Sequence, residues 1–231
     1  MATANELIFD TMELIRGNQI GDDVEVSEDQ VLYQWNNQRA LWLRNEFNKP
    51  GRTIDPFLEQ DLGCLKLTEA DAADCCEIQT GCTVLRTELK IPKTIELHSG
   101  PAITRVGPVH KLTVPFTFDN YQKVIYTANG KYTGKKGVFT FLLNDYMYLV
   151  SKDPKAQLLD YINVRGVFAN PTDLSAFACE DGSACFSYDD EYPINNWMIP
   201  YIKEQVLQQF GMSLQIPKDD ANDAKEDLAK Q

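Results

Sequence analysis

One stretch of the chain, residues 27–48 (SEDQVLYQWNNQRALWLRNEFN), restricts the possible folds more than any other. Ser27 and Gln30 have the spacing of a capping box, in which each side chain accepts a hydrogen bond from a backbone N–H at the start of a helix. Apolar side chains then recur mostly on one stripe. Lys49-Pro50-Gly51 ends the pattern, because proline disfavours helical geometry in the residue before it. The sequence therefore predicts one long helix with a single buried face.

Two tryptophans, Trp35 and Trp42, belong to this predicted helix. Large aromatic side chains contribute most when they are buried, so we interpret both as core residues; an exposed binding anchor is the alternative. Asn36 and Arg39 lie near the apolar stripe, and Arg44 lies on the opposite face. Polar groups beside the stripe indicate that it meets a second surface, such as another subunit. Asn36, Arg39 and Arg44 are therefore predicted as candidate subunit-interface residues.

Two further segments have the period of amphipathic helices. Residues 5–16 have an apolar face, and the helix that they are predicted to form ends at Gly17. Residues 197–210 also have an apolar face, and Gly211 is the predicted C-terminal cap. Pro200 must lie close to the start of this helix, because proline in a helix interior causes a kink.

Between these helices, over residues 83–168, the hydrophobic pattern changes from a helical to an alternating period. Prolines interrupt the region and exclude a long central strand; they are Pro92, Pro101, Pro108 and Pro115. The clearest strands are VFTFLL and YMYLV, which are joined by a turn at Asn144-Asp145. Residues 161–168 form the last predicted strand, whereas residues 118–126 fit either a helical turn or a strand.

The remaining segments are predicted as connections or as a tail. Residues 50–82 look irregular, with short helical turns that Thr68 could cap. Loop character returns after Asn170-Pro171. The stretch PKDDANDAKEDLAKQ is charged and lacks aromatic residues, so we predict a disordered or extended acidic tail over residues 212–231.

The predicted fold class is α+β: a helical base formed by N-terminal and C-terminal helices, an inserted antiparallel β-rich lobe, and a flexible acidic tail. The predicted divisions are residues 1–82 for the N-terminal helices and their connector, 83–168 for the lobe, 169–211 for the return to the base, and 212–231 for the tail. We find no internal repeat.

The charge of the chain excludes several classes of partner. A net charge of −12 argues against tight binding of nucleic acid or of an anionic membrane surface, because both require clustered Lys and Arg. It is compatible with a wall past which DNA slides without binding. No apolar run approaches the length of a membrane span, and the first residues lack the pattern of a signal peptide. We therefore expect no membrane partner and a site of action in the cytoplasm, or in a particle assembled there.

Six cysteines are present: Cys64, Cys75, Cys76, Cys82, Cys179 and Cys185. Without an export signal they are expected to be reduced, buried and inert thiols. Cys75 and Cys82 with Cys179 and Cys185 could form a four-thiolate zinc site, but their spacings do not match those of common zinc ligand pairs. We predict neither zinc nor disulfides. The pair Cys179 and Cys185 is the first exception to consider, because the EDGSA loop between them could bring the thiols together.

The sequence contains no recognisable catalytic constellation. His98 and His110 lie in Pro-rich connections, without a motif that links them to a nucleophile or a metal. Residues 130–137 (GKYTGKKG) lack the order of a phosphate-binding loop and are better interpreted as a basic hairpin tip. Residues 189–191 (DDE) could bind a hard cation, yet a solvated acidic loop is the simpler interpretation. We therefore predict no catalytic, cofactor-binding or metal-binding residue.

Several stretches together resemble one family: NELIFDTMELIRG, NNQRALWLRNEFNKPGRTIDPFLEQDLGCLKL, AADCCEIQTGCTVLRT, IPKTIELHSG, AITRVGPV and NNWMIPYIKEQVLQQF. They are similar to virion structural proteins of the crAss-like tailed bacteriophages of gut Bacteroides. The resemblance covers nearly the whole chain and is weakest in the acidic tail. It implies a protein that is not an enzyme, since the family has no catalytic motif to carry over.

A more distant analogy of architecture links the chain to head–tail adaptor proteins of short-tailed phages. Those proteins combine N-terminal helices and a late helix in a base, insert a β-rich lobe, and extend a C-terminal tail onto the portal. By this analogy residues 5–16, 27–48 and 197–210 form the base, residues 83–168 the lobe and residues 212–231 the tail.

Together these resemblances imply a neck or tail ring component of the portal-proximal head–tail connector, located in the virion and assembled in the host cytoplasm. The expected assembly is a dodecameric homo-oligomeric ring that contacts the portal and neighbouring ring proteins while genomic DNA passes transiently through it. Another tail or muzzle-associated structural protein and a scaffold-like accessory are the alternatives within the virion. A virion-associated enzyme, such as a cell-wall hydrolase, is the competing class.

Overall fold

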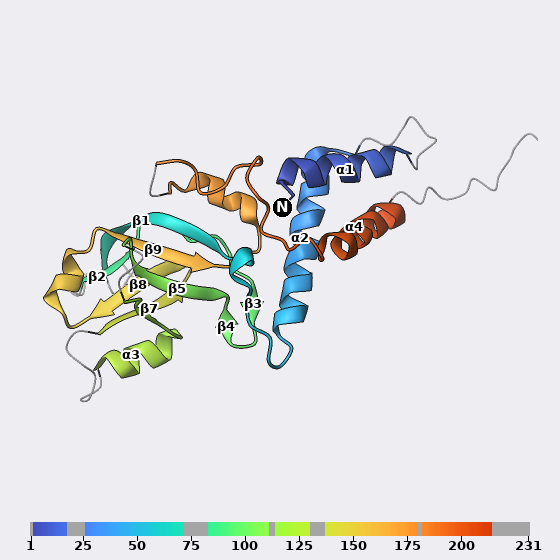
Figure 1. Ribbon diagram of the computed structural model, residues 1–231. Helices are drawn as coiled ribbons and strands as arrows, with labels where there is room; N and C mark the ends of the chain where they lie inside the picture. Colours follow the sequence, from blue (N-terminus) through green and yellow to red (C-terminus); the bar gives the residue numbers. More distant parts are fainter. Residues whose placement is uncertain are drawn as a thin grey trace, which may run out of the picture.

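The computed structural model describes residues 2–17, 26–71, 83–110, 114–129, 137–179 and 182–213 (Figure 1). Its α-helices are α1 (Ala4–Gly17), α2 (Glu28–Phe47), α3 (Tyr121–Asn129) and α4 (Ile199–Ser213). Its strands are β1 (Gln60–Asp71), β2 (Thr83–Thr87), β3 (Glu96–Leu97), β4 (Gly100–Pro101), β5 (Ile103–Pro108), β6 (Thr117–Phe118), β7 (Val138–Leu143), β8 (Tyr146–Ser151) and β9 (Tyr161–Gly166). Short 3-10 helices occur at η1 (Pro56–Leu58), η2 (Pro154–Leu158) and η3 (Pro171–Ala176). The predicted α+β class is confirmed.

The helix α2 stands between the sheet on one side and α1 and α4 on the other (Figure 1). It begins as predicted at Ser27, whose side chain accepts from the Gln30 N–H while the Gln30 side chain accepts from the Ser27 N–H. The helix α1 begins in the same way, because Thr3 and Glu6 exchange side-chain and backbone hydrogen bonds of 3.0 and 3.1 Å. We call α1, α2 and α4 the base.

The start and end of α4 were only partly predicted. Pro200 is the second residue of the helix, where its missing N–H removes no intrahelical bond. Gly211, by contrast, lies inside α4, which continues to Ser213, so the predicted cap at this glycine is wrong. The rest of the predicted acidic tail, residues 214–231, lies outside the described residues.

Seven strands form one sheet in the order β5-β9-β1-β2-β8-β7-β6, and β3 and β4 form a separate short hairpin. The pairings within the larger sheet are antiparallel except that between β6 and β7. The turn at Asn144-Asp145 joins β7 to β8 as predicted. Both residues have positive φ, 51° and 67°, which is the geometry of the tightest hairpin turns.

The long strand β1 was missed in the sequence, where residues 50–82 were predicted to be irregular. Thr68 lies in β1 opposite Arg86 and caps no helix. The pairing of β1 with β9 shifts register between Leu62 and Leu65. Such a bulge breaks the two-residue alternation by which a strand is recognised, because the buried side chains on its two sides are three residues apart. The sheet therefore begins at Gln60, earlier than the predicted lobe.

Residues 118–126, for which the sequence allowed either a helical turn or a strand, are divided between the end of β6 and most of α3. The helix α3 packs on β7 and β8, at the edge of the sheet far from the base (Figure 1). The main hydrophobic core instead joins the base to the sheet. Trp35 lies in this core with 1% of its surface exposed, as predicted, and its Nε1–H donates to the Thr11 hydroxyl at 2.9 Å. Trp42 is only partly buried, so the prediction of two core tryptophans holds fully for one of them.

Candidate functional site

A groove of about 710 Å³ lies between α2 and the near end of the sheet. One wall is the outward face of α2, with Ala40, Leu41 and Arg44. The other walls come from residues 92–96, β4, the end of β7 with its turn, and Ala169. Arg44 is exposed at its edge, and Leu41 is 52% exposed although it is a large apolar side chain. A groove that combines exposed apolar surface with charged edges is typical of an interaction surface.

The far wall of the groove is held in place by backbone hydrogen bonds. The Ile95 N–H donates to the Val167 carbonyl at 3.0 Å, and the Ala169 N–H donates to the Lys93 carbonyl at 2.8 Å. The Ile91 N–H donates to the carbonyl of Asp145 at 2.7 Å, which fixes the β7–β8 turn to the same wall. The groove thus exists in the isolated subunit. Lys93, Glu96 and Asp145 give its lining charges of both signs.

Arg39, predicted at an interface, lies wholly inside the subunit. Its Nε donates to the Pro193 carbonyl at 2.8 Å and its Nη1 to the Phe168 carbonyl at 2.9 Å. The guanidinium also lies 5.7 Å from the centre of the Tyr192 ring. Burial lowers the pKa of Arg39, and the Tyr192 hydroxyl acts in the opposite direction. Arg39 therefore ties α2 to the end of the sheet and to the loop that leads into α4.

Asn36 is the second predicted interface residue, and it too is enclosed, with 6% of its surface exposed. It accepts a hydrogen bond from the Tyr192 hydroxyl at 2.6 Å and donates to the Asn170 side chain at 2.7 Å. Burial raises the pKa of Tyr192 to about 12, so the phenol stays protonated as a donor. The side chains of Asn36 and Arg39 leave no surface for another subunit because their partners are intramolecular. Of the three predicted residues, Arg44 alone is open to a partner.

Sequence reasoning missed a second exposed surface, the aromatic patch of Trp42, Trp197 and Tyr201. The rings of Trp42 and Trp197 meet edge to face with centroids 5.1 Å apart. Trp197, just before α4, is 55% exposed, and Tyr201, four residues later and inside α4, is 61% exposed. The patch lies where α2 meets α4, and the groove lies against the outward face of α2. Trp197 and Tyr201 are spaced four residues apart outside the apolar stripe of α4, and this was the available signal.

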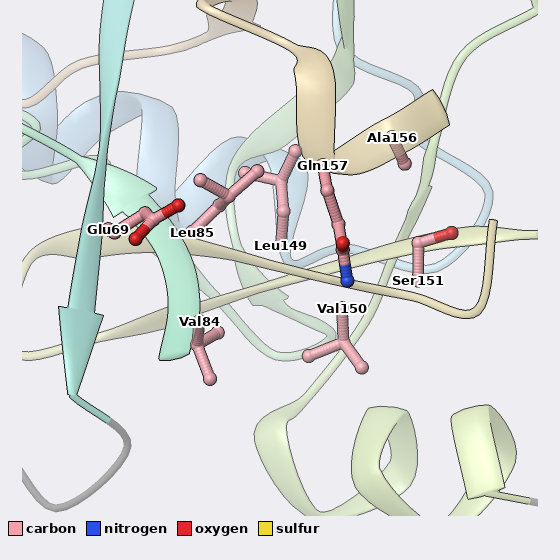
Figure 2. Close-up of a pocket in the computed structure, with 8 residues that line it drawn as sticks. All are labelled: Glu69, Val84, Leu85, Leu149, Val150, Ser151, Ala156 and Gln157. Atoms are coloured by element: carbon pink, nitrogen blue, oxygen red, sulfur yellow. The ribbon is translucent and has the colours of Figure 1, made fainter. Parts of the chain in front are cut away.

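A smaller cavity of about 140 Å³ lies between β2, β8 and η2 (Figure 2). Glu69 is the one carboxylate among its eight lining residues, and neither a histidine nor a cysteine is among them. The Ser151 hydroxyl donates to the Gly137 carbonyl at 3.0 Å and accepts from the Asp153 N–H at 3.1 Å, so it stabilises the adjacent turn. The cavity therefore lacks the pair of groups that acid–base or nucleophilic catalysis requires.

The other residues considered in the sequence have structural partners. The carboxylates of Asp189 and Asp190 accept from the Asn5 side chain and the Ser187 N–H, each at 2.7 Å. His98 lies exposed in the turn between β3 and β4, and its backbone N–H donates to the Asn48 side chain at 2.6 Å. Within the described ranges, no three His, Cys, Asp or Glu side chains are grouped so as to hold a metal ion. Residues 130–136 and Cys75, Cys76 and Cys82 lie outside those ranges. None of the helices in the described part of the chain is both long and apolar enough to cross a bilayer.

The model of one protein family, phage tail ring protein 2, matches residues 6–228. The chain belongs to this family. It is also similar to Ring protein 2 of Bacteroides phage crAss001, with 26% identity over 230 residues that cover 98% of each protein. The chain is thus a structural protein of a phage virion, and the resemblance to crAss-like phage proteins is confirmed.

Membership of the phage tail ring protein 2 family changes how the two surfaces are interpreted. The groove and the aromatic patch offer apolar and aromatic contact area, whereas neither they nor the smaller cavity presents a reactive constellation. Such surfaces suit protein–protein contact, where exposed tryptophan, tyrosine and arginine contribute most of the binding energy. Arg44, Trp197 and Tyr201 are therefore the first residues to test.

Proposed function

We propose that the chain forms a closed homo-oligomeric ring in the neck or tail of the virion, as a portal-proximal component of the head–tail connector. Membership of the tail ring family and the likeness to Ring protein 2 support this proposal. The observation that carries it is the presence of two different exposed surfaces on one subunit: the groove beside Leu41 and Arg44, and the aromatic patch.

A cyclic ring requires a heterologous interface, in which one surface of each subunit binds a different surface of the next. The aromatic patch of one copy would dock in the groove of its neighbour, with Trp197 and Tyr201 as anchors. Aromatic anchors favour pockets from which water is excluded. The contacts of Arg39 and Asn36 support this arrangement, because they fix the groove and the patch relative to each other within one subunit.

The net charge of −12 supports a role in which genomic DNA passes through the ring without being held, because like charges repel the phosphates. In the proposed role the protein is a structural conduit and not an enzyme. The portal and the neighbouring ring proteins are its proposed partners, in a dodecameric ring assembled in the host cytoplasm.

Electron microscopy of the purified virion, with this chain traced in the density, tests the proposal directly. We expect a single ring around the DNA channel close to the portal, with α2 of each subunit beside the neighbouring copy. A dimer with two-fold symmetry inside the particle, or a position remote from the channel, would contradict it.

Assembly in solution tests the two surfaces separately. The purified chain is expected to be monomeric or weakly associated, and to form rings when the portal is supplied as a template. Leu41→Asp in the groove and Trp197→Ala in the patch should each abolish ring formation, as measured by mass photometry. Leu158→Asp is the matched control, because Leu158 is also exposed but lies on η2, outside both surfaces. Rings that form equally well from all three variants would exclude the groove and the patch as the interface.

A further inference from the structure

Two thiols meet at a place where the sheet is irregular. Residues 177–179 and 182–185 pair with each other: Ala178 and Ala184 form an isolated antiparallel bridge, the Cys179 N–H donates to the Ser183 carbonyl at 2.7 Å, and the Cys185 N–H donates to the Phe177 carbonyl at 2.8 Å. In this pairing Cys179 and Cys185 lie on the same face, opposite to that of the alanines. The two side chains interact, and the Cys179 thiol contributes to the raised pKa of Cys185.

This hairpin docks on the bulge in β1. The bulge leaves Gly63 and Cys64 out of register with β9. The Cys64 N–H donates to the Ala178 carbonyl at 3.5 Å, and the Gly63 backbone beside the Cys185 thiol acts to lower its pKa. The Cys179 thiol lies 3.9 Å from the carbonyl oxygen of Asp61. Backbone groups at the bulge and just before it thus lie beside both sulfur atoms.

We infer that Cys179 and Cys185 are a dithiol poised to form an intramolecular disulfide with a low-molecular-weight disulfide as oxidant. A disulfide requires two sulfur atoms that approach to about 2.05 Å with little movement of the backbone, and diagonal neighbours on one face of a paired segment meet this demand better than distant thiols. Both side chains are half-buried, while residues 182–184 beside them are exposed, so a small oxidant has access.

The reaction proceeds by two exchanges. The Cys179 thiolate attacks one sulfur of the oxidant RSSR, forms a mixed disulfide and releases one RS⁻, which takes up a proton. Cys185 then loses its proton to solvent and attacks the Cys179 sulfur, and the second RS⁻ leaves. Two protein thiols are oxidised, and one RSSR is reduced to two RSH. Burial and the contact with Cys179 raise the pKa of Cys185 to about 12, which favours the dithiol until an oxidant is present.

The bond would fix the hairpin on β1 and, through the next residues, would strengthen the link between sheet and base. The segment after the hairpin holds the start of α1: the Tyr192 N–H donates to the Ala2 carbonyl at 3.1 Å, and Thr3 pairs with Glu191. The reduced form therefore suits folding in the host cytoplasm, and the oxidised form suits a particle that has left it.

Peptide mapping tests this inference without interference from the other cysteines. Tryptic cleavage after Arg165 and Lys203 gives one peptide that contains Cys179 and Cys185 and no other cysteine. The native full-length chain is incubated with oxidised glutathione, remaining thiols are alkylated, and the digest is weighed by mass spectrometry. We expect this peptide to lose both alkylation sites and to become two hydrogen atoms lighter.

Three variants complete the test. Cys64→Ser is the matched control and should form the bond as the parent does. Cys179→Ser and Cys185→Ser should each leave one cysteine carrying a glutathione adduct or an alkyl group. Amide exchange at Ala178 and Ala184 should slow on oxidation in the parent and remain unchanged in these two variants. If both cysteines of the parent stay alkylated, or if Cys179 or Cys185 is found cross-linked to the Cys64 peptide instead, the inference is wrong.

Discussion

The core around α2 and the small cluster under α3 differ in size and in their treatment of polar groups. The first joins α1, α2 and α4 to the sheet and encloses Thr11, Asn36 and Arg39. The second consists of five buried residues, Val124, Ala128, Phe139, Phe141 and Tyr148, and its contacts are mainly aromatic. The Phe141 ring stacks on Tyr148 at 5.2 Å and meets Tyr121 edge to face at 5.0 Å.

The difference shows that hydrogen bonds of buried polar groups link distant segments in the main core, whereas mainly aromatic contacts join neighbouring elements under α3. Each enclosed polar group of the main core bonds to a separate segment, so loss of one group disturbs elements that are distant in sequence. The cluster under α3 involves neighbouring elements at the edge of the sheet, so α3 can open without the base. We expect global unfolding to follow the main core and local opening to follow α3.

Trp35→Ala should give the largest effect of any single change. The indole fills the centre of the main core, so its loss leaves a cavity. The Thr11 hydroxyl loses the Nε1–H donor but keeps its own bond to the Leu7 carbonyl at 2.7 Å. We expect a loss of about 3–5 kcal/mol in unfolding free energy, measured by urea denaturation. Trp42→Ala is the control within the same helix, and it should cost much less because Trp42 is only partly buried. Equal losses would remove the distinction between core and edge tryptophans.

Arg39→Ala should cost about 3 kcal/mol, because two buried carbonyls lose their donors and the volume of the side chain is left empty. Arg39→Met separates charge from packing. It restores most of the volume without a buried cation, so it should recover part of the loss, as chemical denaturation would show. If Arg39→Ala is as stable as the parent, the guanidinium does not hold the base to the sheet.

The free energy of unfolding should fall at high pH, because the main core encloses the Tyr192 phenol. Tyr192 has its pKa raised by burial to about 12 from 10.0, so the unfolded state releases this proton first as the pH rises. The contribution of Tyr192 is complete below pH 10 and is lost as the pH approaches 12, with about 2 kcal/mol lost near pH 11.5. Urea denaturation at several pH values should show this fall in the parent and a smaller one in Tyr192→Phe. Parallel profiles for the two proteins would contradict it.

The smallest effect is expected in the cluster under α3. Phe141→Ala removes the ring that contacts both Tyr121 and Tyr148, and we expect little change in the free energy of global unfolding, because the site lies at an edge that can open and collapse locally. Amide exchange should accelerate in α3 while the amides of α2 keep their protection. Acceleration in both helices to the same extent would show that the two clusters unfold as one unit.

Local signals in the sequence were sufficient for several elements. The capping box at Ser27 and the stop at Lys49-Pro50 predicted α2, and the alternation around Asn144-Asp145 predicted the β7–β8 hairpin. These features depend on neighbouring residues alone, so they can be recognised without knowledge of the fold. The resemblance carried by long stretches of sequence predicted the family, and no rule of periodicity could have done so.

Only the tertiary structure decided where β1 lies and that the Arg39 side chain is buried. The bulge between Leu62 and Leu65 hides the alternation of β1, and the strand forms because β9 and β2 lie on its two sides. Arg39 looks like a surface cation in the sequence, yet the carbonyls that enclose it belong to Phe168 and Pro193, more than a hundred residues away. The sequence by itself determined which segments could form helices and hairpins, since those depend on local backbone preferences. Which polar side chains became internal links and which stayed at the surface depended on contacts between distant segments, which exist only after the chain has folded.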